Sequence, residues 1–123
     1  MLKRGTTTLL SLALLGTALH AQEIPKRTIE VKINGAAKDT VYLANYYGNK
    51  LYYADTAIAD AKGKVVFRSP RGYKAGVYAI VVPGPKYFEM VVNEPVIQMA
   101  TEKADLLGKL QVLKSNENDL FIG

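Results

Sequence analysis

Residues 27–35 read RTIEVKING, and they already indicate the fold class. Their apolar side chains occupy every second position, at Ile29, Val31 and Ile33, with charged residues between them. An alternation of period two is typical of a strand that buries one face and leaves the other in water. Residues 35–39 then predict a turn. The stretch therefore predicts a half-buried β-strand lying on a core.

The same alternation, interrupted by turns, continues along the chain. Gly48-Asn49 predicts a two-residue hairpin turn, because glycine accepts the positive φ that such a turn requires. Asp60 with Gly63 predicts the next turn, and Pro83 ends an apolar, β-branched run that suits a central strand. Strands are expected within residues 28–34, 40–47, 50–60, 65–68, 77–82, 87–92, 96–101 and 109–114.

Seven or eight short strands without long helical segments predict an all-β domain, either an antiparallel β-sandwich or a small barrel. Residues 101–109 are compatible with one helical turn. The last eleven residues, LKSNENDLFIG, place the N-cap types Ser115 and Asn116 ahead of acidic and apolar residues, which is how a helix begins. We therefore expect a β-sandwich domain at 22–114 and the start of a helical segment, apparently truncated, at 115–123.

The first 21 residues have the layout of a secretory signal peptide. Two cations, Lys3 and Arg4, precede a short apolar run, and small residues surround a cleavage point expected after Ala21. The apolar run is shorter than the ~18 residues that a membrane span needs. We therefore expect a periplasmic or otherwise exported chain with no membrane span after cleavage.

Outside residues 1–21, the composition lacks residue types that catalytic and metal-binding sites commonly use. Without residues 1–21 the net charge falls to +3, from 14 cations minus 11 acids, which does not suggest nucleic-acid binding. The chain has no cysteine, and its one histidine, His20, leaves with the signal peptide. A thiol nucleophile, an imidazole base and the commonest soft-metal ligands are then missing. We expect no enzyme activity, no cofactor and no metal; the enzyme alternative is a small hydrolase with two carboxylates ~5–10 Å apart.

Five tyrosines lie within twelve residues around the predicted hairpin. As a binding site they would form a stacking platform for a sugar or a peptide. As ordinary sheet chemistry they would cover an outer face, with Tyr46 opposite Leu51 and Tyr53 opposite Ala44, and this interpretation is favoured. The residues selected for any contact surface are Tyr46, Tyr47, Tyr52 and Tyr53, with Tyr42 completing the cluster.

Two charged stretches each have both a functional and a structural interpretation. Residues 61–88 contain six cations and no acid, which suits an acidic partner but also suits solvated turns and protected strand edges. Arg68, Arg71 and Lys74 are the second choice for a contact surface. Residues 115–119, SNEND, hold enough oxygens for Ca²⁺, but they lack the alternate spacing and central glycine of a calcium loop. A helix start accounts for them more simply.

Taken together, residues 41–67, 76–95 and 113–121 resemble the N-terminal β-domain of unknown function of secreted thioredoxin-like proteins from Gram-negative bacteria. The shared features are a strand reaching Leu43, an Asp55-Thr56 step, G-x-V-x-F at 63–67, G-x-Y at 76–78 and S-x-E-N at 115–118. In that family a helical segment and then a thioredoxin-like domain, related to peroxiredoxins and thiol-disulfide oxidoreductases, follow the β-domain. The redox C-x-x-C-type site belongs to that following domain, so the resemblance transfers no catalytic residue to this chain.

These observations give two functional hypotheses. The first is a non-catalytic exported accessory domain that precedes a thioredoxin-like domain, with a domain-positioning or partner-binding role. Its expected partner is that downstream domain or another periplasmic protein. The alternative is a freestanding exported module that binds a glycan or a peptide through the tyrosine-rich hairpin.

Overall fold

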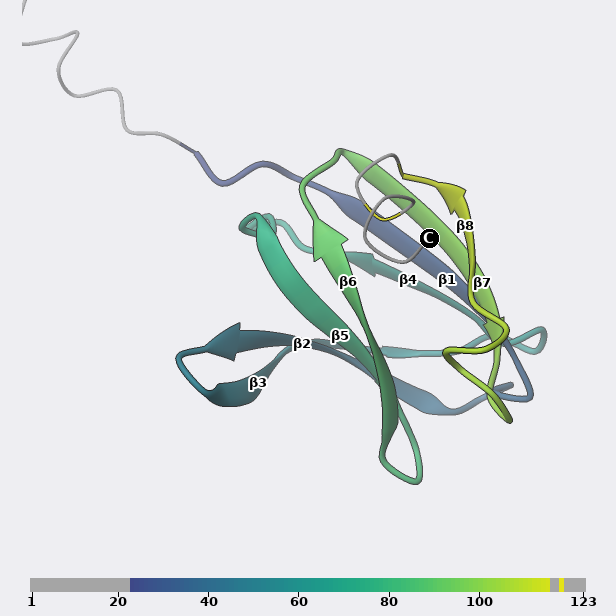
Figure 1. Cartoon of the computed structure of the whole chain (residues 1–123). Coiled ribbons are helices and arrows are strands. Elements are labelled where there is room, and N and C mark those ends of the chain that lie inside the picture. The colour runs from purple at the N-terminus through teal and green to yellow at the C-terminus, as the bar shows by residue number, and fades with distance from the viewer. Residues whose placement is uncertain (1–22, 116–117, 119–123) are drawn as a thin grey trace, which may run out of the picture.

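The computed structural model describes residues 23–115 and residue 118, which form two four-stranded β-sheets packed face to face (Figure 1). Sheet A has the strand order β4-β1-β7-β8, and sheet B has the order β3-β2-β5-β6. The sheets do not close into a barrel, so the all-β sandwich prediction is confirmed. The strands are β1 (Thr28–Asn34), β2 (Thr40–Tyr47), β3 (Lys50–Ile58), β4 (Lys64–Arg68), β5 (Gly76–Val82), β6 (Lys86–Val92), β7 (Val96–Glu102) and β8 (Gln111–Lys114).

The core lies between the sheets, and the alternation seen in the sequence builds it. Ile29, Val31 and Ile33 of β1 are fully buried, as the opening stretch predicts. The inward positions of β4 and β6 follow the same rule. Each buried aliphatic or aromatic side chain contributes about 1.5–3 kcal/mol relative to exposure. The largest fully buried side chains are Phe67, Ile29, Ile33, Leu43, Ile80, Met90, Ile97, Met99, Val31, Val41, Val65 and Val82.

The sheet order departs from a purely antiparallel arrangement at one pair. β1 and β7 run parallel, with Thr28 opposite Val96 and Asn34 opposite Glu102. Parallel neighbours need a long crossover, and here residues 35–95, which include the whole of sheet B, connect the two strands. Local alternation does not specify which distant strand is the neighbour.

Residues 103–110 form successive turns rather than a helix. One hydrogen bond of helical span, from the Lys109 N–H to the Asp105 carbonyl, is present at 3.0 Å. The Asp105 side chain accepts a further bond from the Gly108 N–H at 3.1 Å, and an isolated bridge joins Asp105 to Glu102. These local bonds turn the chain directly into β8.

Two predictions fall outside the described part of the chain. The signal peptide at 1–21 lies wholly outside it, and of the predicted helix start at 115–123 only Ser115 and Asn118 lie within it. Within the described residues, no helix is long and apolar enough to cross a membrane.

Candidate functional site

The β2–β3 hairpin carries the tyrosines selected from the sequence, and it projects beyond the strands of sheet A (Figure 1). Gly48 has φ +63° in the two-residue turn, and Tyr47 pairs with Lys50 across it. The predicted pairs of Tyr46 with Leu51 and of Tyr53 with Ala44 are both present. The turn and register of the hairpin are therefore as predicted.

The register places the four selected tyrosines on two opposite faces of sheet B. Residues directly opposite each other on antiparallel strands share a face, and neighbours along a strand alternate. Leu43 points into the core, so Ala44 and Tyr46 point outward, together with Tyr53. Tyr47 and Tyr52 lie on the inner face, at the end of the hairpin that extends past sheet A. The selected set is thus two pairs with different surroundings rather than one surface.

On the outer face, Tyr42 packs against a small apolar cluster and stacks with Tyr53. Tyr53 stacks on Tyr42 with ring centroids 4.3 Å apart and an interplanar angle of 14°. Beside them Ala44, Ala79 and Val81 are almost completely buried, although they lie on the face turned away from the core. Tyr42 therefore covers part of the outer face, and Tyr53 lies against the ring of Tyr42.

Tyr46 crosses this face to reach β6. Its hydroxyl donates a 2.5 Å hydrogen bond to the Glu89 carboxylate, and this bond raises the pKa of Tyr46 to about 12. The bond ties β2 to β6 across the intervening strand β5. Tyr46 is therefore engaged within the sheet rather than available to a ligand.

The inner pair is exposed and unsupported by the core. Tyr47 is 80% exposed and Tyr52 is 49% exposed. Their rings meet edge to face, with centroids 6.3 Å apart and an angle of 77°. Together with Asn45 they line an open pocket of about 420 Å³. Two perpendicular aromatic faces beside a carboxamide form a notch suited to an apolar or sugar-like group that also needs a hydrogen-bond partner.

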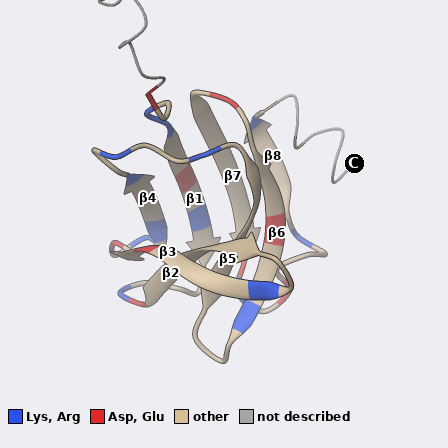
Figure 2. Cartoon of the chain, turned by 90° about the vertical axis from the view of Figure 1, so that its left-hand side faces the viewer, with Lys and Arg blue, Asp and Glu red and all other residues tan. Residues whose placement is uncertain are grey.

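The second-choice cations lie apart from the tyrosines in the chain. Arg68 ends β4, whereas Arg71 and Lys74 lie in the loop between β4 and β5. Among the described residues, none of their three side chains takes part in an ion pair. Lys and Arg are spread over several strands and loops (Figure 2). The acid-free stretch thus forms no single basic patch.

A buried tyrosine pair holds the β4–β5 loop against the sandwich. The Tyr73 hydroxyl donates a 2.5 Å bond to Asp55 of β3, and the Tyr78 hydroxyl donates a 2.7 Å bond to the Lys74 carbonyl. Arg27 donates to the Tyr73 carbonyl from the other side. Burial, followed by the bond to Asp55, raises the pKa of Tyr73, and burial raises that of Tyr78. The Asp55-Thr56 step and the G-x-Y segment, seen as separate features in the sequence, are therefore linked through this loop.

The raised tyrosine pKa values predict when the fold loses stability in alkali. A pKa raised in the folded state stabilises the protein fully below the unfolded value of about 10 and ceases to do so as pH rises through the folded value. For Tyr46 that window runs from about 10 to about 12. We expect ultraviolet titration to show late-ionising tyrosines, one of which E89Q shifts to lower pH and Y46F removes. Ionisation of all eight tyrosines together near pH ~10 would contradict this assignment.

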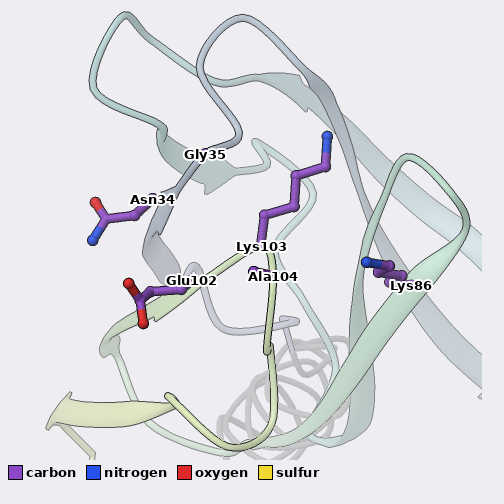
Figure 3. A pocket seen from close by; sticks show the side chains of 6 residues that line it. All are labelled: Asn34, Gly35, Lys86, Glu102, Lys103 and Ala104. Atoms are coloured by element: carbon purple, nitrogen blue, oxygen red, sulfur yellow. The ribbon is translucent and has the colours of Figure 1, made fainter.

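The larger pocket lies among residues that sequence reasoning did not single out as a site. It measures about 510 Å³ and is lined by Asn34, Gly35, Lys86, Glu102, Lys103 and Ala104. Lys86 lies across the opening from the side chains of Asn34 and Glu102 (Figure 3). Lys103 pairs with Asp39 at 2.7 Å, which neutralises one of the two cations. The pocket is an open cleft with no convergent set of donors, so no ligand class is assigned to it.

Near the carboxyl end of the chain, Asn118 binds to the edge of sheet B. Asn118 is fully buried, and its carboxamide accepts a 2.5 Å bond from the Val91 N–H of β6 and donates to the Val91 carbonyl. Ser115 accepts a bond from the Asn118 N–H at 3.2 Å, which is the N-cap pattern. The Ser115 hydroxyl donates to Glu94 at 2.6 Å. We call Ser115 and Asn118 the carboxyl-terminal anchor; the sequence suggested the cap but not the attachment to β6.

The acidic side chains of residues 23–115 are the remaining candidates for a metal site. No three His, Cys, Asp or Glu side chains there lie close enough together to hold a metal ion. Asp55 is engaged by Tyr73, Asp39 by Lys103, and Glu30 by Lys64 at 3.0 Å. The carboxylates with the closest partners thus serve as structural acceptors.

A family model named "Domain of unknown function (DUF4369)" matches residues 27–121, which span the sandwich and the anchor. The chain belongs to the DUF4369 family. The match covers every strand of this DUF4369 domain. None of the curated proteins compared with it matches. Among solved structures, the crystal structure of (S)-allantoin synthase is similar with a TM-score of 0.49 at 6% identity, over 75% of this chain and 44% of that protein. The chain thus spans less than half of that protein's length.

Proposed function

We propose that this DUF4369 domain is a non-catalytic, exported accessory domain that precedes a thioredoxin-like domain and holds it in a defined position. The carboxyl-terminal anchor is the observation that carries the proposal. A buried carboxamide that bonds both backbone groups of Val91 fixes the chain at one point on the edge of β6. A fixed point of this kind near the carboxyl end of the domain would suit a link to a following domain.

Other features support the same proposal. The signal-peptide layout supports export, and a domain without cysteine has only its core to stabilise it in an oxidising compartment. The resemblance to secreted thioredoxin-like proteins is the reason for proposing a thioredoxin-like neighbour. Within such a protein, thiol-disulfide chemistry would be carried out by the following domain, while this one positions it or presents it to partners.

The direct test is to read the coding sequence downstream of the Gly123 codon. We expect the reading frame to continue through a helical segment into a thioredoxin-like domain with a C-x-x-C-type motif. A stop codon directly after Gly123 would contradict the proposal.

The inner tyrosine pair favours a second candidate function, a binding module for a glycan or a peptide. Tyr47 and Tyr52 are the two selected tyrosines on the inner face, and they line a notch together with Asn45. Aromatic faces with an adjacent hydrogen-bonding group suit both a sugar ring and an extended peptide. This function would be compatible with the accessory role, because the notch and the anchor lie on different elements.

For this second candidate we expect nuclear magnetic resonance titration with cellohexaose or with a proline-rich peptide to shift the amide signals of Asn45, Tyr47 and Tyr52. Y47A or Y52A should weaken binding about tenfold, since one aromatic contact is worth roughly 1 kcal/mol or somewhat more. Y87A is the matched control, because Tyr87 is 54% exposed but lies on β6. Equal losses with all three variants would exclude the notch as the binding site.

A further inference from the structure

β3 presents the longest strand edge among the described residues, and part of that edge is uncovered. Of the other edges, β8 has four residues, and β4 has five and lies against β3. The edge of β6 is met at Val91 by Asn118. β3 has nine residues, contains no proline, and pairs on one side only, with β2. An exposed edge of this length, with several apolar side chains, is a template for pairing with another strand.

The open part of this edge is confined to residues 50–54. Ala54 is a bulge, because Tyr53 pairs with Ala44 whereas Asp55 pairs with Leu43. Beyond it, the Asp55 carboxylate accepts a 2.8 Å bond from the Thr56 N–H and a 2.5 Å bond from Tyr73. A bulge and a locally bonded carboxylate both interrupt strand pairing. Five residues, reading KLYYA, remain available.

We propose that these residues pair with the same residues of a second copy, as antiparallel strands related by a two-fold axis at Tyr52. In this register Tyr52 lies opposite Tyr52 of the second copy, and Leu51 lies opposite Tyr53. Leu51 and Tyr53 share the outer face, as opposed residues must, while Tyr52 lies on the inner face beside Tyr47.

The same register avoids repulsion across the pair. Lys50 lies opposite Ala54, so no like charges face each other. Leu51, Tyr52 and Tyr53 are 36%, 49% and 58% exposed in the single chain, and pairing would bury part of this area. In an isologous interface the same surface of both copies must be complementary to itself. This register meets that requirement, because each central pair joins Leu or Tyr to Tyr. The short contact predicts a transient dimer, below the ~1,200 Å² typical of stable complexes.

The salt dependence of binding distinguishes a second copy from other partners of this edge. Each copy has a net charge of +3 without residues 1–21, from 14 cations minus 11 acids, so two copies repel at long range. Added salt screens this repulsion and should strengthen the dimer. An acidic peptide or an anionic glycan on the same edge would instead be weakened by salt.

The test is sedimentation velocity on the purified chain over roughly 10 μM to 1 mM, the range in which a weak interface populates. We expect a concentration-dependent shift from monomer to dimer that salt enhances. Y52K should abolish the dimer by opposing two lysines at the two-fold axis, and Y87K, the matched control on β6, should leave it unchanged. Mixing Y52K with Y52E one to one should restore dimers, because unlike charges then meet at the axis.

Three results would overturn the proposal: a wild-type chain that stays monomeric throughout, a dimer that Y52K leaves intact, or a Y52K and Y52E mixture that remains monomeric while both variants are folded. Tyr52 is half exposed and makes no core contact, so both variants are expected to fold. Thermal unfolding of each variant alone verifies this.

Discussion

Replacing Gly63 by alanine is expected to destabilise this domain by about 3 kcal/mol. Gly63 has φ +83°, a left-handed conformation that costs an L-residue about 1–2 kcal/mol. A Cβ at this position would lie 2.1 Å from the carbonyl oxygen of Ile33. That oxygen belongs to backbone at the end of β1, and the Ile33 N–H itself donates to the Gly63 carbonyl at 2.8 Å. The clash therefore cannot be relieved without moving β1 away from the turn.

Gly48→Ala is the matched control. Gly48 also has a positive φ, +63°, but nothing lies within 4 Å of the position its Cβ would occupy. G48A should cost only the conformational term, roughly 1 kcal/mol. Urea unfolding of both variants measures the difference in free energy of unfolding. Equal costs would show that the contact with Ile33 is not what requires glycine at position 63.

This position also explains one of the segments that mark the family resemblance. In G-x-V-x-F, Gly63 makes the close turn against β1, and Val65 and Phe67, two residues apart, enter the core. The spacing thus combines a backbone requirement with the period of a strand. A short segment of this kind specifies where β4 begins and which of its faces is buried.

The elements of the fold could be predicted from the sequence because alternation and turn chemistry act over a few residues. The hairpin register followed from its two-residue turn, and the inward faces of β1, β4 and β6 followed from the positions of their apolar residues. The parallel pairing of β1 with β7 depends on contacts between residues about seventy positions apart, which no local pattern encodes. Sheet order was therefore found only in the structure.

The candidate site was predictable in part for the same reason. The register predicted that Tyr46 would lie opposite Leu51 and Tyr53 opposite Ala44, and both pairs are present, whereas the residue that packs against Ala44 and Ala79 is Tyr42. The exposure of Tyr47 and Tyr52 arises because the hairpin extends past sheet A, and this depends on the relative lengths of strands in different sheets. The pocket that includes Lys86 and Lys103 likewise depends on how the ends of the two sheets meet.

Replacing Asn118 by alanine is expected to cost about 2–3 kcal/mol. The change removes both side-chain bonds to Val91 and the 2.9 Å bond from the carboxamide to Ser115, and it leaves the Val91 N–H and carbonyl without these partners. A polar group that loses its partner in a buried place costs about 1–3 kcal/mol. S115A, which removes the cap and the bond to Glu94, should cost about 1 kcal/mol. Urea unfolding of the wild-type chain, N118A and S115A measures the differences in free energy of unfolding.

Asn93→Ala is the control for Asn118, because Asn93 is an exposed asparagine in the turn after β6 and should change stability by less than about 0.5 kcal/mol. Hydrogen exchange adds a local measurement: the Val91 amide should exchange faster in N118A but not in N93A, since Val91 donates to the Asn118 carboxamide. Slow exchange at Val91 in N118A would mean that the carboxamide does not hold the chain to β6. The accessory-domain proposal would then lose the contact on which it rests, even if a thioredoxin-like domain follows in the gene.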